Sequence, residues 1–211
     1  MSDIKHHIPE NLIAAYASGA LGHHFALVVA THVSMCTQCR AALAAHETIG
    51  GLVLEDLDAQ PVSMGVKSNL MAQLDAPIEV EPAPKRMGAY PGPVMGALGG
   101  DVPKWRSLGF GSKQSILHND ATGSVRLLFI PPGQAMPDHG HNGLELTLVL
   151  QGSFHDEDGA FGVGDVEVAD EDVEHTPIAG NGPPCICLAA TDAPLRFSGL
   201  VPRILQPLFR I

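Results

Sequence analysis

The sequence predicts a multi-domain α + β chain, in which a small four-helix domain precedes an all-β sandwich or barrel. Three observations support this prediction. Apolar residues recur with helical spacing in residues 1–76. Prolines and glycines accumulate in residues 77–103, which is typical of an exposed linker. In residues 104–211, short β-rich runs alternate with turn residues, as in sandwiches and barrels.

Composition and charge restrict the function classes. The net charge is −11, and both halves of the chain are acidic, so a direct DNA-binding repressor is disfavoured. An acidic surface can instead bind a basic partner, or serve solubility alone. The longest apolar runs are far below the roughly 18 residues that span a membrane, and the polar N-terminus resembles no secretory signal. The four cysteines form two close pairs, which favours metal or redox chemistry in a reducing cytosol.

Four helices are expected in the N-terminal domain. The first begins at Pro9 and stops at Gly19, since proline suits the first helical position and glycine the C-terminal end. The others are expected at about residues 23–32, 37–56 and 63–74. Four short helices with small connections indicate a compact domain. A bound metal would contribute much of the stability of so small a unit.

A histidine and two cysteines lie where the second and third predicted helices meet. His32, Cys36 and Cys39 have the spacing H-x₃-C-x₂-C, which places an imidazole and two thiols on one side of a helix or tight helix-turn. This ligand set suits a tetrahedral Zn²⁺ ion. The alternative is a pair of buried cysteines beside an unrelated histidine. A closed structural zinc site needs a fourth ligand.

The fourth ligand must come from another histidine of the helical domain. His24 and His46 lie about 12 Å and about 10 Å along their helices from the motif, which is too far to share an ion. His6 and His7 precede a separate helix that can fold back toward the motif. Their position alone does not decide between them.

The predicted linker is not uniformly polar. Its apolar residues are untypical of a free tether and suggest packing against one of the two domains, without indicating which. They are Met87, Tyr90, Val94, Met95 and Leu98.

The C-terminal part carries a second constellation of ligand-type residues. Strands are expected at residues 124–130, 145–150, 166–169, 185–190 and 195–200. Between the first two, Gly133-x₅-His139-x-His141-x₃-Glu145-x₆-Gly152 resembles the first cupin motif at every position. Cupins are jelly rolls that hold a metal inside the barrel. The even spacing of the two histidines and the glutamate turns all three to one face of an extended chain.

A fourth ligand in the barrel is expected from a strand opposite, and His175 is the candidate. The second cupin motif would run G-x₅-P-x-G-x₂-H-x₃-N. Gly164 and His175 fit it, but Asp170, Asp172 and Ala179 stand for the proline, glycine and asparagine. This departure puts the tight turn before His175 in doubt, although not the fold. Three imidazoles and a carboxylate suit Zn²⁺, Fe²⁺, Mn²⁺ or Ni²⁺.

The N-terminal half resembles a known family more specifically. Residues 5–39, with a histidine pair followed by H-x₃-C-x₂-C, are similar to the opening of the ChrR-type anti-sigma factors, whose helical part is a zinc-binding anti-sigma domain. The resemblance implies that His7 completes the zinc site of His32, Cys36 and Cys39, and that the cupin metal is also zinc. It further implies a partner, an extracytoplasmic-function-type sigma factor that the helical domain keeps off RNA polymerase core.

Two functions are therefore carried forward. The first is a cytoplasmic anti-sigma factor with one zinc ion in each domain, which binds one sigma factor and no nucleic acid or membrane. Family resemblance implies that its cupin senses singlet oxygen or an organic peroxide and so triggers release. The second is a metal-dependent cupin dioxygenase or hydrolase with an N-terminal docking domain. Cys185 and Cys187 share one face of a strand, as small buried apolar residues or, alternatively, as a redox pair near the metal.

Overall fold

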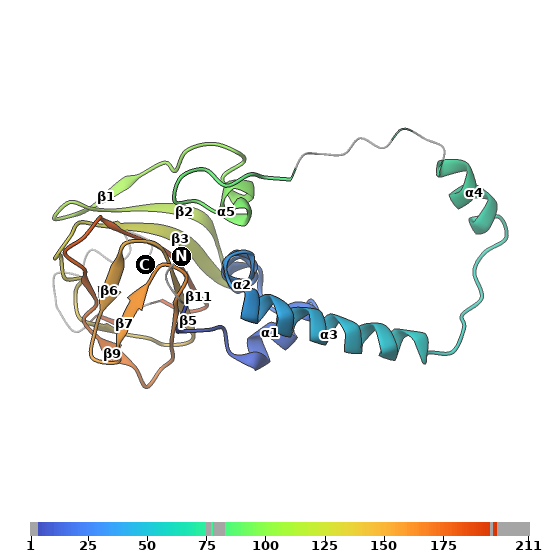
Figure 1. Ribbon diagram of the computed structural model, residues 1–211, viewed down its shortest axis with the longest axis horizontal. Helices are drawn as coiled ribbons and strands as arrows, with labels where there is room; N and C mark the ends of the chain where they lie inside the picture. The colour runs from blue at the N-terminus through green and yellow to red at the C-terminus, as the bar shows by residue number, and fades with distance from the viewer. Residues whose placement is uncertain (1–3, 75–76, 78–82, 195, 198–211) are drawn as a thin grey trace.

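The computed structural model describes residues 4–74, 77, 83–194 and 196–197. Helices occupy the N-terminal part and strands the C-terminal part, so the predicted α + β fold class is confirmed (Figure 1). The helices are α1 (Glu10–Ala17), α2 (His23–Met35), α3 (Thr37–Glu55), α4 (Val66–Gln73) and α5 (Gly92–Ala97). Among the described residues, none of these helices is long and apolar enough to cross a bilayer.

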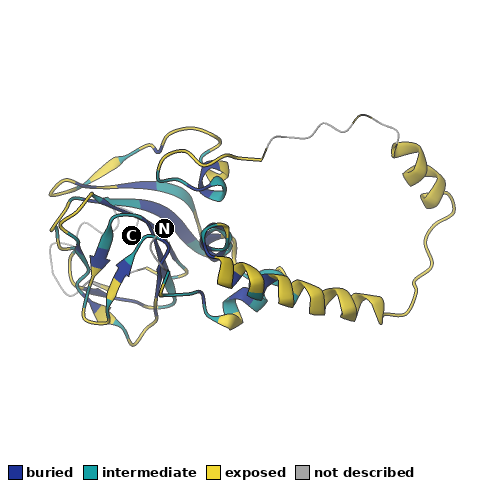
Figure 2. Ribbon diagram, in the orientation of Figure 1, coloured by how far each residue is buried: buried dark blue, intermediate teal, exposed yellow. Residues whose placement is uncertain are grey.

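The prediction of a compact four-helix unit is wrong in one respect. Helices α1, α2 and α3 pack together, whereas α4 stands away from them and contains no buried residue (Figures 1 and 2). Helix α4 has only eight residues, and a helix of that length is marginal in water without a surface to pack against. Its apolar side chains therefore have no partner within the described part of the chain.

The stretch predicted as an exposed linker contains a helix. In α5, Val94 and Met95 are buried, and the helix packs against α2. The suggestion that apolar residues of this stretch pack on one domain is confirmed for these two, and the domain is the helical one. The proposed division of the chain at residues 76 and 103 stays a prediction.

The described residues of the C-terminal part form one large and two small antiparallel sheets. The large sheet has the order β1-β2-β3-β11-β5-β8, and the small ones are β10-β6-β7 and β12-β4-β9. The strands of the large sheet are β1 (Arg106–Gly109), β2 (Ser112–Asp120), β3 (Gly123–Ile130), β5 (Glu145–Gln151), β8 (Val166–Ala169) and β11 (Cys185–Thr191). The others are β4 (His139–Gly140), β6 (Ser153–His155), β7 (Ala160–Gly162), β9 (Glu174–His175), β10 (Ile178–Ala179) and β12 (Arg196–Phe197).

Four of the five predicted strands correspond to β3, β5, β8 and β11. The fifth, at residues 195–200, coincides with β12 at residues 196–197, and its other residues lie outside the described ones. Strand β2 was not predicted, because its buried residues are polar. Ser112, Gln114 and Ser115 are each at most 4% exposed, so the strand lacks the apolar alternation by which a half-buried strand is recognised.

The helices and the large sheet share one hydrophobic core. Helix α2 lies across β3, β5 and β11, and Phe25, Val28 and Val29 are buried there. Alternate residues of β11 face opposite ways: Ile186 and Leu188 join the core under the helices, whereas Cys185 and Cys187 join the core inside the barrel. Removing the barrel would therefore expose a face of α2.

Candidate functional site

A sharp junction between α2 and α3 brings the first group of ligand-type side chains together. Helix α2 ends at Met35, and Cys36 is extended, with φ −105° and ψ 116°. The Cys36 Sγ accepts a hydrogen bond from the Cys39 backbone N–H at 3.5 Å and so caps α3. His32 in the last turn of α2 thereby faces the two thiols. The predicted placement on one side of a helix-turn is what the structure shows.

His7 is the histidine that joins this group. Its Nδ1 lies 3.4 Å from Cys36 Sγ and 3.6 Å from Cys39 Sγ. One donor atom from each of His7, His32, Cys36 and Cys39 lies within 4.8 Å of the others. His6 points toward the barrel instead, where its ring centroid lies 4.5 Å from that of Phe161. Geometry thus separates two histidines that their position in the sequence did not.

The two excluded histidines lie outside this group, as expected. His46 faces Glu10, with Nε2 3.7 Å from Oε1. His24 is buried against the turn between β2 and β3, where Gly123 has φ +151° and leaves no room for a side chain. A Cβ at Gly123 would lie 2.7 Å from the His24 ring. His24 therefore packs between α2 and the large sheet.

The N-terminal group fits a divalent metal. His32 is fully buried, its Nδ1 lies 2.9 Å from the Gly164 carbonyl oxygen, and its Nε2 has no hydrogen-bond partner among the described residues. Burial lowers the pKa of His32 to about 4 and raises that of the Cys39 thiol to about 11, so a thiolate here needs a cation beside it. Tetrahedral bonds of about 2.3 Å to sulfur and 2.0 Å to nitrogen would set S···N at about 3.5 Å. The observed separations of Cys36 and Cys39 from His7 match this value.

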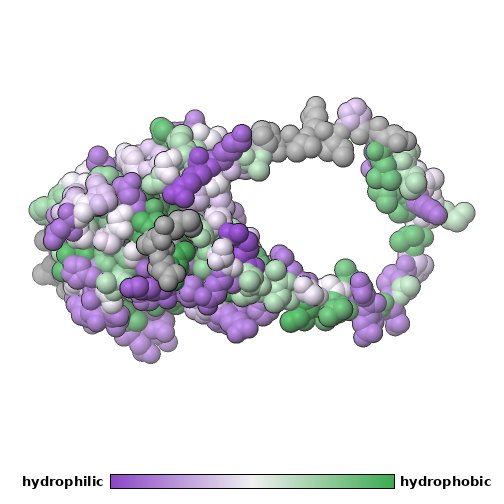
Figure 3. Space-filling model, in the orientation of Figure 1, coloured by the Kyte–Doolittle hydropathy of each residue, from purple (hydrophilic) through white to green (hydrophobic). Residues whose placement is uncertain are grey.

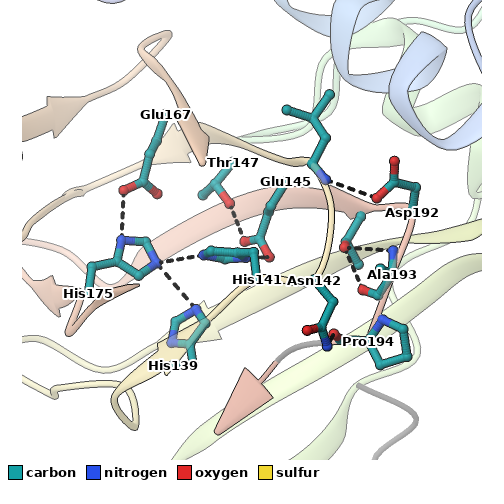
Figure 4. A network of polar contacts seen from close by, with 12 residues as sticks. His139, His141, Asn142, Glu145, Thr147, Glu167, His175, Asp192, Ala193 and Pro194 are labelled. Atoms are coloured by element: carbon teal, nitrogen blue, oxygen red, sulfur yellow. Dashed lines mark hydrogen bonds and ion pairs between the residues drawn. The ribbon is translucent and has the colours of Figure 1, made fainter. Parts of the chain in front are cut away.

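Three histidines converge inside the barrel. His139 begins β4, His141 follows that strand directly, and His175 ends β9, which pairs with β4. The Nε2 atom of His175 lies 3.3 Å from that of His139 and 3.3 Å from that of His141 (Figure 4). Tetrahedral bonds of about 2.1 Å to nitrogen would set N···N at about 3.4 Å. The cluster therefore has the dimensions of a metal site.

Oxygen atoms face the outer nitrogens of His139 and His141, through a hydrogen-bond contact at His139 and at ion-pair distance at His141. His139 Nδ1 lies 2.8 Å from the Pro137 carbonyl oxygen. His141 Nδ1 lies 3.5 Å from Glu145 Oε2. Ligating histidines usually carry their proton on the nitrogen that faces such an oxygen, which leaves the other nitrogen free for a metal.

His175 is held by two carboxylates that the sequence analysis did not identify. Its Nδ1 lies 2.9 Å from Asp156 Oδ2 and 3.0 Å from Glu167 Oε1. Burial opposes a charge on His175, but the bonds and charges of Glu167 and Asp156 raise its pKa to about 9. Burial raises the pKa of Glu167 to about 8. The only sequence signal for Glu167 was its place within a largely apolar strand; Asp156 lies in a turn and gave none.

Glu145 does not join the three converging nitrogens in this conformation. Its Oε2 faces the Nδ1 edge of His141, and its Oε1 accepts a hydrogen bond from Thr147 Oγ1 at 2.9 Å (Figure 4). Its role as a fourth ligand stays a prediction. The turn before His175, which the degraded motif left in doubt, does form. Asp170 supplies it, accepting from Asp172 N–H through Oδ1 and from Val173 N–H through its carbonyl.

The second cysteine pair is buried and unreactive in character. The Sγ atoms of Cys185 and Cys187 lie 3.4 Å apart, and both residues are at most 1% exposed. The hydrogen bond with Cys185, together with burial, raises the pKa of Cys187 well above its ordinary value. The reactive thiolate form of Cys187 is thus disfavoured. This agrees with the interpretation of the two cysteines as small apolar residues of the barrel core.

Comparison with known proteins gives matches over the whole chain. Residues 100–193 match the family described as the ChrR cupin-like domain. The chain is 50% identical over 212 residues to the anti-sigma-E factor ChrR of Cereibacter sphaeroides, covering 99% of each protein. It also resembles a chain in the crystal structure of Rhodobacter sphaeroides SigE in complex with the anti-sigma ChrR. That match has a TM-score of 0.81 and 47% identity, and covers 90% of this chain and 100% of the other. An RmlC-like cupin of Ralstonia eutropha covers 46% of this chain and 68% of its own at 22% identity and a TM-score of 0.42, too remote to bear on function.

The geometry predicts different roles for the two N-terminal histidines. His7→Ala is expected to weaken metal binding at the N-terminal site at least tenfold, because it removes one of four donors, whereas His6→Ala keeps the metal. Cobalt(II) titration reports this site selectively, because only its ligands include thiolates and give the sulfur-to-cobalt charge-transfer band. Loss of the band in His6→Ala and its retention in His7→Ala would reverse the assignment.

Proposed function

Because the chain belongs to the ChrR family of anti-sigma factors, we propose that it binds an extracytoplasmic-function-type sigma factor in the cytoplasm and keeps it off RNA polymerase core. The solved complex of SigE with ChrR supports a sigma factor as the partner. The acidic charge of −11 suits a partner whose own surface is basic because it binds DNA.

The observation that carries this proposal is an exposed apolar surface on α3, α4 and the segment between them. We call it the 49–74 surface. Each of its members is more than half exposed: Ile49, Leu52, Val53, Leu54, Leu57, Val62, Met64, Leu70, Met71 and Leu74. Figure 3 shows hydrophobic residues along the outer end of α3 and on α4. Monomeric proteins rarely leave so large an apolar array in water, and such arrays mark protein interfaces.

The arrangement of α3 and α4 suits a protein partner. Helix α3 projects away from the barrel, and α4 stands apart from it at the end of a connecting segment (Figure 1). Two separated helices with exposed apolar side chains can close on a partner from two sides and bury those side chains against it. Contacts with the partner would then bury the apolar side chains of α3 and α4 that the chain itself leaves exposed.

We propose one zinc ion in each site. The N-terminal ion would be held by His7, His32, Cys36 and Cys39, and would fix the junction from which α3 projects. With four protein ligands that site is closed, as structural zinc sites are. The barrel ion would be held by three histidines, with Glu145 as the fourth ligand. The donors there also suit Fe²⁺, Mn²⁺ or Ni²⁺.

We further propose that the barrel governs release of the sigma factor under oxidative stress, with singlet oxygen or an organic peroxide as the signal. The buried cluster of three histidines and the core shared with the helices support this role. The second hypothesis, a dioxygenase or hydrolase, has no comparable support. The relative that matches over the full chain is an anti-sigma factor, and the resemblance to other cupins is remote.

Size-exclusion chromatography with light scattering tests the proposal on the full-length protein of known metal content. We expect a 1:1 complex with an extracytoplasmic-function-type sigma factor from the same cell, two zinc ions per chain and no oxygen uptake. Singlet oxygen from an illuminated dye should then dissociate the complex. Absence of a complex at micromolar concentrations would contradict the binding function, and substrate-dependent oxygen uptake by an iron-loaded protein would favour the enzyme.

A further inference from the structure

One turn of the barrel touches both metal sites. Residues Gly164–Glu167, which we call the Gly164–Glu167 turn, run from the connection after β7 into the start of β8 and lie beside the chain that leads into α1. The Gly164 carbonyl oxygen lies 2.9 Å from His32 Nδ1, so the barrel backbone orients a ring of the N-terminal site. The Ile4 side chain covers Gly164, where a Cβ would approach it to 2.6 Å. The contact is therefore made at a position without room for a side chain.

The next residue of this turn holds the segment before His7. Asp165 Oδ1 accepts hydrogen bonds from the backbone N–H groups of Lys5 at 2.6 Å and His6 at 2.8 Å. The His6 carbonyl in turn accepts from the Val166 N–H at 3.2 Å. Asp165 is only 4% exposed, and hydrogen bonds to a buried carboxylate are among the stronger ones. The position of His7 is thus fixed by a carboxylate of the barrel.

The last residue of the turn holds the other site. Glu167 Oε1 lies 3.0 Å from His175 Nδ1, and Glu167 is 6% exposed. Glu167 follows Gly164 by three residues, so at most about 10 Å of backbone separates the two contacts. Four consecutive residues therefore position one histidine of the barrel site and two histidines of the N-terminal site.

We propose that the Gly164–Glu167 turn couples the two sites, so that a metal in the barrel strengthens metal binding at the N-terminal site. A barrel metal bound to Nε2 of His175 fixes that ring, and the ring fixes the Glu167 carboxylate at the start of β8. Loss of this metal frees the ring, and the change passes through Asp165 and Gly164 to His7 and His32. As a means of sigma-factor release this coupling rests on the proposed function, but the coupling itself does not.

Cobalt(II) affinity of the full-length protein tests the coupling. The thiolate charge-transfer band reports the N-terminal site alone, and competition with a chelator gives its affinity. His139→Ala empties the barrel site without touching Glu167, and cobalt content verifies that it is empty. We expect His139→Ala to lower the cobalt affinity of the N-terminal site about tenfold in the wild-type background. When Asp165→Ala is also present, we expect His139→Ala to lower that affinity less than twofold. A double-mutant cycle of this kind isolates the coupling.

Asp170→Ala is the matched control, because Asp170 also caps a turn of the barrel but accepts its hydrogen bonds from Asp172 and Val173, which belong to the barrel itself. It should leave the tenfold effect intact. Equal weakening by His139→Ala with and without Asp165→Ala, or no weakening at all, would overturn the proposal.

Reciprocity supplies a second measurement if Asp165→Ala itself loses the N-terminal metal. Emptying the N-terminal site with His7→Ala must weaken the barrel site by the same factor, because coupling between two binding equilibria is symmetric. An unchanged barrel affinity would refute the coupling. Sigma-factor binding by the wild type is measured separately, so a coupled protein that binds no sigma factor rejects the proposed function alone.

Discussion

Replacing Cys36 with serine should remove the N-terminal metal and lower the affinity for the sigma factor more than 100-fold. The substitution takes away a proposed ligand of the site that joins α2, α3 and the segment before α1. Structural zinc contributes on the order of 10–16 kcal/mol to the folding of small zinc-finger peptides. Only part of that is expected to be lost here, because α2 also packs on the sheet. A 100-fold change corresponds to about 2.8 kcal/mol.

The serine variant separates the effect of losing the metal from the effect of losing the helix cap. Cys36 caps α3 through its side chain, and serine is among the best residues at such a position, so the cap is retained. The change is measured as zinc content and as sigma affinity by fluorescence anisotropy. Cys185→Ser, in the barrel core, is the matched control and should keep both metals and the affinity. A metal-free Cys36→Ser protein that binds within threefold of wild type would show that the metal is not needed to present α3.

A charge on the 49–74 surface should abolish binding without unfolding the protein. Leu52 on α3 is 62% exposed and Leu70 on α4 is 58% exposed, so glutamate at either position is solvated in the free chain. In the complex the same carboxylate would be buried against apolar residues without a partner. Central interface residues contribute roughly 2–4 kcal/mol each, so the double variant Leu52→Glu/Leu70→Glu is expected to lose at least 100-fold in affinity.

Two measurements separate binding from folding for this variant. The free energy of unfolding in urea should change by less than about 0.5 kcal/mol, as is usual for exposed positions. Phe110→Glu is the control, since Phe110 is 91% exposed at the turn between β1 and β2 and lies outside the 49–74 surface. Equal affinity for wild type and the double variant would place the sigma-binding surface elsewhere.

Local spacing predicted which side chains come together wherever one element or one turn carries them. His32, Cys36 and Cys39 share a helix junction, and His139 and His141 share an extended segment. The helical period, the period of an extended chain and the capping pattern were therefore sufficient to predict that these side chains lie together. The choice of His7 over His6 depended on more. It is set by hydrogen bonds to Asp165, which lies 159 residues beyond His6, and no local pattern contains that contact.

Three other features also depended on tertiary contacts. Helix α4 has the sequence of a helix but no partner within the described residues, so its separation from the other helices could not be read from its own pattern. Strand β2 is buried through the polar residues Ser112, Gln114 and Ser115, so it lacks the apolar alternation that identifies a strand from its sequence. Glu145 has the spacing of a ligand, yet its carboxylate lies on the outer edge of the His141 ring.

Competition with RNA polymerase core tests the central claim most directly. Fluorescently labelled sigma factor is first bound to core, and the full-length zinc-loaded protein is then titrated in while the fraction of sigma on core is measured. We predict that one equivalent removes the sigma factor from core, and that Leu52→Glu/Leu70→Glu leaves it there. Sigma factor that stays on core at every concentration of the wild-type protein would contradict the anti-sigma function.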